Sequence, residues 1–216
     1  MELKKGKVTL LCTASYDRLT CFLSRLISLC ADVESTLQIK LRTSTDTFKD
    51  ILVEFVDPHA EVTLIFCGHG TENHLITGTE QDCSSLHSAV DEGVFYDGSF
   101  VNVGPNLLAA LTCEAGSQLG RAFSKTTGGK FFGYKDQLSF IVTDDDDYNI
   151  WWRKIMCATV NKITEEQKIT PETVDFVKGL YEEAHTFFLA GEGRMKEKAF
   201  GMRMCLLRDL NAMCHY

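Results

Sequence analysis

The sequence predicts an α/β fold, in which helices cover both faces of a mainly parallel sheet of about six strands to give three layers (α/β/α). Three observations indicate this fold. Short apolar runs rich in β-branched residues recur through residues 1–142. Segments with apolar residues at spacings of three and four lie between them. From residue 143 onward the pattern is helical. Strands that alternate with helices form parallel sheets that are buried on both faces.

Each apolar run is short enough for a strand, and the helical patterns fit between the runs. We expect strands at 7–13, 37–43, 61–67, 106–112, 130–134 and 138–142. We expect helices at 17–30, 48–56 and 117–123. The polar stretch 68–104 separates the third strand from the fourth, and Asp97-Gly98 within it favours a hairpin.

The C-terminal part is expected to consist of extra helices packed on the same domain, so that residues 1–142 form the α/β core and 143–216 the helical part. Thr143 and the run Asp144–Asp147 suit a helix N-terminus, where negative charge is favourable. Thr170 before Pro171 predicts the start of the next helix, with the threonine as its cap. The glycines at 191 and 193 end that helix, and a last helix follows over 199–210.

Composition narrows the possible partners and the compartment. The net charge of −8 argues against nucleic acid, whose phosphates require Lys and Arg. No apolar run approaches the roughly 20 residues of a membrane span, so no membrane partner is expected. Nine cysteines, an odd number mostly within apolar stretches, predict reduced thiols in the cytoplasm.

Two chemically notable segments follow apolar strands. Gly68-His69-Gly70 follows the third strand, and Cys113-Glu114-Ala115-Gly116-Ser117 follows the fourth. The carboxyl ends of parallel strands meet at one edge of the sheet, so an imidazole and a thiol are expected to lie together there. An imidazole can take the proton of a thiol and later donate it to a leaving amine. The helix expected after Cys113 would help to hold a thiolate charge, and the amides of Gly70 and Cys113 would face an oxyanion.

An apolar strand ending in His-Gly, followed by another ending in Cys-x-x-Gly, resembles the caspase-like superfamily of cysteine peptidases. The matching segments are VTLIFCGHG at 62–70 and LLAALTCEAGS at 107–117. The second segment is most similar to the cysteine motif of legumains and CHAT proteases, and it lacks the Gln-Ala-Cys signature of caspases. The resemblance implies a caspase-like fold and a cysteine endopeptidase that acts on a protein or peptide substrate. It implies a His69–Cys113 dyad. No cofactor and no metal are expected.

The family builds its first substrate pocket from the ends of strands one, three, four and five. The resemblance therefore implies pocket candidates at Asp17, Glu114, Lys135 and Asp136. The acidic candidates favour a basic P1 residue, whereas Lys135 opposes it. Family members are commonly latent until an activating event, so an activating protein partner or a homodimer is expected, with the segment 71–104 as a regulatory loop.

Several alternatives remain open at this point. A pseudoprotease with the same fold would act as a binding scaffold. A zinc site from Cys67, His69, His74 and Cys83 lacks the spacing of a known finger or ribbon, and Asp144–Asp147 could bind Ca²⁺. A nucleotide-binding domain lacks the glycine-rich loop after strand one, and an α/β-hydrolase lacks Gly-x-Ser-x-Gly.

Overall fold

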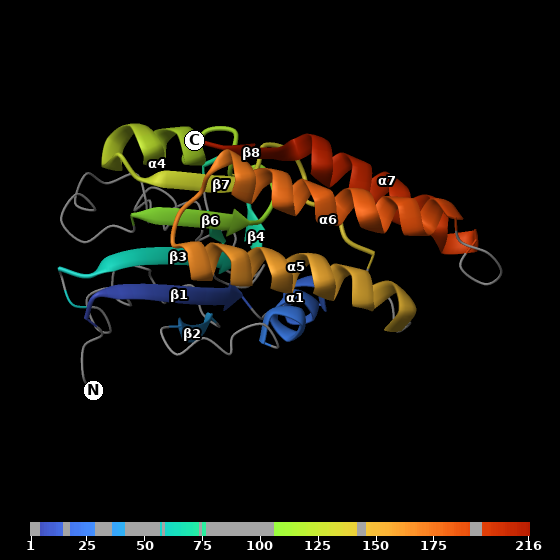
Figure 1. Cartoon of the computed structure of the whole chain (residues 1–216), viewed down its shortest axis with the longest axis horizontal. Coiled ribbons are helices and arrows are strands. Elements are labelled where there is room, and N and C mark those ends of the chain that lie inside the picture. Colours follow the sequence, from blue (N-terminus) through green and yellow to red (C-terminus); the bar gives the residue numbers. More distant parts are fainter. Residues whose placement is uncertain are drawn as a thin grey trace.

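The protein is α/β in the computed structural model, and its main sheet has six strands in the order β2-β1-β3-β6-β7-β8. The structure describes residues 5–14, 18–28, 36–41, 57, 59–73, 75–76, 106–141, 146–190 and 196–216. Five strands are parallel, and β8 pairs antiparallel with β7 at one edge (Figure 1). The parallel strands are β1 (Lys7–Ala14), β2 (Thr36–Leu41), β3 (Glu61–Cys67), β6 (Leu107–Leu111) and β7 (Lys130–Tyr134).

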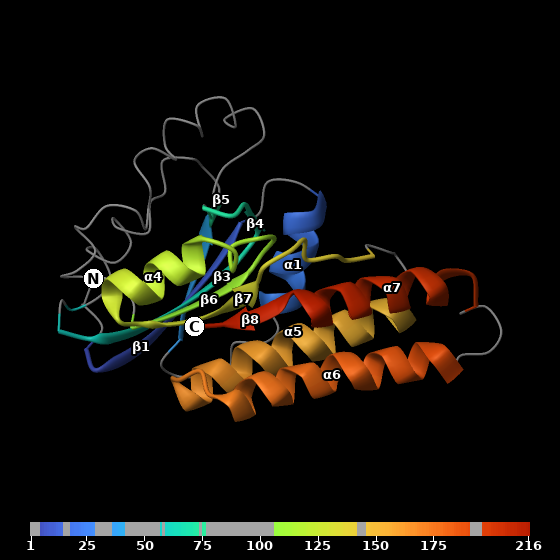
Figure 2. The same cartoon turned by 90° about the horizontal axis from the view of Figure 1, so that it is seen from above.

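Helices lie on both faces of this sheet, which is compatible with the expected three layers (Figure 2). On one face lies α4 (Leu119–Thr127). The other face is covered by α1 (Arg18–Ser28), α5 (Asp146–Glu166), α6 (Pro171–Ala190) and α7 (Lys196–Ala212). The helix expected at 48–56 and the hairpin near Asp97-Gly98 lie outside the described residues.

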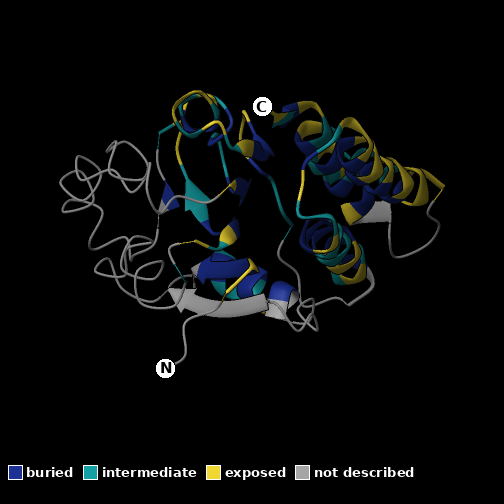
Figure 3. Ribbon diagram, turned by 60° about the vertical axis from the view of Figure 1, so that its left-hand side comes forward, coloured by how far each residue is buried: buried dark blue, intermediate teal, exposed yellow. Residues whose placement is uncertain are grey.

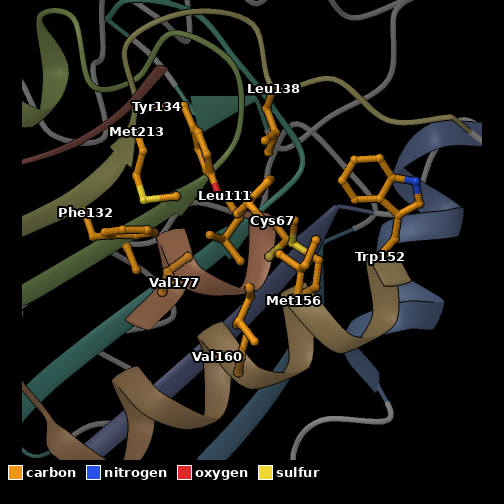
Figure 4. Close-up of a cluster of buried hydrophobic side chains, with 14 of the residues drawn as sticks. Cys67, Leu111, Phe132, Tyr134, Leu138, Trp152, Met156, Val160, Val177 and Met213 are labelled. Carbon is orange, nitrogen blue, oxygen red and sulfur yellow. Dashed lines mark hydrogen bonds between the residues drawn. The ribbon is translucent and has the colours of Figure 1, made fainter. Parts of the chain in front are cut away.

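Alternate residues of β1, β3, β6 and β7 enter two separate cores, because successive side chains of a strand point to opposite faces. In β3, Leu64 and Phe66 join the α4 side, whereas Ile65 and Cys67 join the α5–α6 side. Figure 4 shows the latter core, in which side chains from β3, β6 and β7 meet Trp152, Met156 and Val160 of α5. Buried residues accordingly line the sheet and the inner sides of the helices (Figure 3). Burial on both faces explains why the strands read as near-continuous apolar runs.

The expected strand at 138–142 is wrong: residues 137–141 form no regular structure. Leu138 is buried in the helix-side core, and the amide of Ser139 donates to a side chain, Asp209 Oδ1, instead of to a neighbouring strand. The sixth strand is instead β8 (Met213–His215), which follows α7 and pairs with β7.

The helix start predicted at Thr170 is confirmed. The amide of Thr173 donates to Thr170 Oγ1 at 3.2 Å, and Pro171 opens α6. The helix ends at Ala190, directly before the predicted break at Gly191.

Candidate active site at the carboxyl edge of the sheet

His69 lies at the carboxyl end of β3, beside the point where the order of strands reverses. The chain passes from β1 to β2 on one side and returns to β3 on the other. Such a switch point is where open α/β sheets usually bind ligands. After β3, His69 and Gly70 form the short strand β4, which pairs antiparallel with β5 (Leu75–Ile76). The side chain of His69 is half-buried there.

Gly70 lies directly against the segment that carries Cys113. A Cβ atom at position 70 would collide with Thr112 Oγ1 and would lie 2.9 Å from the carbonyl oxygen of Cys113. A glycine is therefore required for this approach. The two segments meet because they follow the neighbouring strands β3 and β6. Cys67 and Leu111, the last residues of these strands, are register partners. The structure thus brings the His-Gly and Cys segments into contact, and the approach of the His69 imidazole to the Cys113 thiol stays a prediction.

Cys113 begins a tight turn that leaves β6. Glu114 has a positive φ of 58°, and the amide of Ala115 donates to the carbonyl of Cys113 at 2.6 Å. The amide of Gly116 donates to the Tyr134 carbonyl at 2.8 Å, which ties the turn to the end of β7. Ser117 Oγ adds a 2.8 Å bond to the Lys135 carbonyl. These hydrogen bonds to Tyr134 and to Lys135, directly after β7, therefore hold the Cys113 turn at the sheet edge.

The helix after Cys113 begins later than expected, and its first two amides donate to carbonyl groups. α4 starts at Leu119, whose amide donates to the carbonyl of Glu72 at 2.7 Å. The amide of Gly120 donates to Ala115 at 2.8 Å. These bonds fasten the His69–Glu72 segment to the Cys113 turn, and the expected help from this helix N-terminus to a thiolate is not supported.

The thiol of Cys113 is half-buried and donates to the carbonyl oxygen of Leu138, with 3.7 Å between sulfur and oxygen. Burial raises the pKa of the Cys113 thiol, and the negative charges of Glu114 and Asp209 raise it further, whereas the hydrogen bond with the Leu138 backbone and the positive charge of Arg208 lower it. A carbonyl oxygen accepts only from the protonated thiol. Cys113 is therefore a thiol, not a thiolate, in this arrangement.

Three of the four pocket candidates lie together beside Cys113. The amide of Glu114 donates to the carbonyl of Asp136 at 3.0 Å, and Lys135 and Asp136 are exposed at the end of β7. The carboxylate of Asp136 faces Arg208 of α7, with 3.3 Å between Oδ1 and Nη2. The hydrogen bond from the Gln137 amide and the pairing with Arg208 hold the pKa of Asp136 below its usual range. Asp17 lies outside the described residues.

Sequence reasoning missed Asp209, a fully buried carboxyl on α7 close to this site. Its Oδ1 accepts from the amide of Ser139 at 2.8 Å. Burial raises its pKa to about 8, against the opposing effects of this hydrogen bond and of Arg208. The available signal was its spacing from Met202 and Leu206, which places an acid on the inward stripe of a helix.

The cysteines depart in one respect from the expected reduced state. Six are free among the described residues, but Cys157 of α5 is disulfide-bonded. Within the same part of the chain, no three His, Cys, Asp or Glu side chains gather in a way that could hold a metal ion. Of the zinc ligands considered, His74 and Cys83 lie outside the described residues, as do 144–145 of the acidic run and most of the segment 71–104.

No protein-family model, curated protein or solved structure matches the chain. Among the helices that the structure describes, none combines the length and apolar character needed to cross a bilayer.

Proposed function

We propose that this chain is a caspase-like cysteine endopeptidase with His69 and Cys113 as its catalytic dyad. The observation that carries the proposal is the contact of Gly70 with Thr112 and the Cys113 carbonyl. It joins an imidazole-bearing and a thiol-bearing segment at the carboxyl ends of two neighbouring parallel strands. The mainly parallel sheet with helices on both faces supports a caspase-like fold.

The proposed reaction is amide hydrolysis through an acyl-enzyme. His69 takes the proton from Cys113 Sγ, and the thiolate attacks the scissile carbonyl carbon. The C–N bond breaks as His69 gives its proton to the leaving amine. Water then hydrolyses the thioester, which restores the thiol and releases the carboxylic acid. The amides of Gly70 and Cys113 are the proposed oxyanion donors, and the reaction uses no cofactor.

The proposed substrate is a protein or peptide with a basic P1 residue. Glu114 is the acidic candidate next to the nucleophile, and Asp17 is a second. Asp136 contributes less than the sequence suggested, because Arg208 already engages its carboxylate. Lys135 is exposed beside it and would disfavour a cationic side chain.

The free protein is proposed to be latent. The hydrogen-bonded, protonated Cys113 supports a resting form that an activating protein partner or a homodimer would switch on. The cytoplasm is the proposed compartment. The six free cysteines support it, whereas the disulfide at Cys157 stands against a uniformly reduced chain.

A pseudoprotease scaffold is the second candidate, and the state of the thiol favours it. Burial raises the pKa of Cys113, which lowers the thiolate fraction that nucleophilic attack requires. Catalysis then depends on whether His69 activates this thiol.

Hydrolysis of fluorogenic peptides with Arg, Lys, Asp or Asn at P1 separates the two candidates. We expect the wild type, after preincubation at high concentration to drive self-association, to release the fluorophore, with Arg or Lys preferred, and Cys113→Ala to abolish release. Cys205→Ala is the matched control, because Cys205 is also half-buried with a raised pKa but lies on α7. If the wild type were as inactive as Cys113→Ala, with or without preincubation to drive self-association, the scaffold would be favoured.

A further inference from the structure

One peptide group connects the candidate nucleophile to α7. The carbonyl oxygen of Leu138 accepts from the Cys113 thiol at 3.7 Å. The N–H of the same peptide group, on Ser139, donates to Asp209 Oδ1 at 2.8 Å. Because a peptide group is planar and rigid, a constraint on its N–H also fixes its carbonyl. Cys113 is thereby linked to a carboxyl in a different element of the fold.

We propose that Asp209 is a positioning residue, which holds the Leu138–Ser139 peptide so that its carbonyl retains Cys113 as a resting thiol. Cys113, Leu138, Ser139 and Asp209 form what we call the thiol latch. Movement of α7 or of the 137–141 segment would open the latch and release the nucleophile. The inference rests on the proposed role of Cys113 and supplies a device for the latency proposed above.

The packing around the latch supports a holding role. Asp209 has no exposed surface, and Leu138 is 6% exposed within the helix-side core. A buried carboxyl is unfavourable unless it is hydrogen-bonded, and its Oδ1 bond goes to the peptide that contacts the thiol. Hydrogen bonds in series polarise one another, so the Asp209 bond also strengthens the Leu138 carbonyl as an acceptor.

Charge acts on Cys113 separately from the latch. The groups that face Asp209 are Arg208 and Cys205 of its own helix, Tyr134 of β7, Tyr181 of α6, and Cys113. With a pKa of about 8, Asp209 is mostly neutral at pH 7 and ionised at pH 9. Its negative charge raises the pKa of both Cys113 and Cys205. Only Cys113 has the hydrogen bond to Leu138, so Cys205 reports the charge effect alone.

The experiment measures the alkylation rates of Cys113 and Cys205 by iodoacetamide in one sample, with mass spectrometry of the labelled peptides. It compares the wild type with Asp209→Asn, which keeps an oxygen acceptor for Ser139, and with Asp209→Leu, which removes it. At pH 7 we expect Asp209→Leu to label Cys113 about fivefold faster, the factor for one lost hydrogen bond. Asp209→Asn should retain the wild-type rate at Cys113, and Cys205 should be unchanged in both.

At pH 9 the charge effect becomes visible. Both variants lack the Asp209 carboxylate, so both should label Cys113 and Cys205 faster than the wild type. The extra acceleration at Cys113 in Asp209→Leu should persist. Equal rates at Cys113 for the two variants at both pH values would overturn the latch.

A second variant covers the possibility that Asp209→Leu does not fold. Ser139→Pro removes the N–H donor outside any helix or strand and leaves Asp209 in place. It should also accelerate labelling of Cys113 and not of Cys205 at pH 7, and an unchanged rate at Cys113 would again overturn the latch. Peptide hydrolysis is read separately in the variants that open the latch, Asp209→Leu and Ser139→Pro. Faster labelling of Cys113 without hydrolysis in these variants rejects the peptidase, and hydrolysis without faster labelling rejects this inference.

Discussion

Gly70 is the residue on which the candidate site most directly depends. Its lack of a side chain lets β4 approach the carbonyl of Cys113 and the buried hydroxyl of Thr112. Its neighbour His69 is thereby placed at the edge where β6 ends. The same contact also contributes to stability, because the two segments pack without a gap.

We predict that Gly70→Ala lowers the free energy of unfolding by about 1–3 kcal/mol, the cost of overpacking a tight contact. Urea titration followed by circular dichroism measures it. Gly179→Ala is the control, because nothing lies within 4 Å of a Cβ there and alanine favours the interior of α6. The control should be stabilised by up to about 1 kcal/mol. Equal effects of the two substitutions would contradict the tight contact.

The sequence located His69 and Cys113 because short-range patterns carry them: each follows an apolar strand and has glycine nearby. It did not locate Asp209. In the last expected helix, Leu210 belongs to the apolar stripe with Met202 and Leu206, but the structure buries Asp209 fully and leaves Leu210 half-buried. The difference is a rotation of the stripe by one residue, and it depends on how α7 leads into β8, a tertiary contact that periodicity does not encode.

At the scale of elements, Gln167 connects α5 to two strands of the sheet. It follows the end of α5 with a positive φ of 51°. Its Nε2 donates to Thr9 Oγ1 and its Oε1 accepts from Thr63 Oγ1, each at 2.7 Å. Thr9 and Thr63 are register partners on β1 and β3. One amide side chain therefore secures the helix against the two strands that flank the switch point.

We predict that Gln167→Leu lowers the free energy of unfolding by about 2 kcal/mol, because it leaves two threonine hydroxyls without their amide partner. Chemical denaturation measures it. Adding Thr9→Val and Thr63→Val should recover most of the loss, since removing all the polar partners together is nearly neutral. If Gln167→Leu lowered the free energy of unfolding by less than about 0.5 kcal/mol, the hydrogen bonds of Gln167 would contribute no more than an ordinary surface contact, which would contradict this role.

The strands β1, β3, β6 and β7 were predictable because each is a compact apolar run. β8 was not: it has three residues, and it forms only because α7 delivers Met213–His215 to the free edge of β7. The segment 138–142 looked like a strand because it is apolar. Its apolar residues pack beneath helices instead, as Leu138 and Phe140 do against the core that contains Trp152.

At the scale of the whole molecule, the alternation of strand and helix patterns along the sequence predicted the fold class. It did not predict the order of the strands in the sheet. The parallel strands bring the ends of β3, β6 and β7 to one edge. The C-terminal residues then close around that edge: Tyr216 Oη donates to the Gly116 carbonyl at 2.8 Å, and Arg208 faces Asp136. The candidate site is therefore assembled from the middle and the C-terminal end of the sequence, and local patterns predict only its His69 and Cys113 segments.

The most direct test of the central claim is labelling with peptidyl acyloxymethyl ketones that carry Arg, Lys, Asp or Asn at P1, followed by mass spectrometry. Wild type, His69→Ala and Cys113→Ala are compared, and the labelling of Cys205 serves as the internal control. We predict selective labelling at Cys113 that falls at least about 100-fold in His69→Ala, the usual contribution of a general base. Labelling spread over several cysteines, or unchanged in His69→Ala, would contradict a His69–Cys113 dyad.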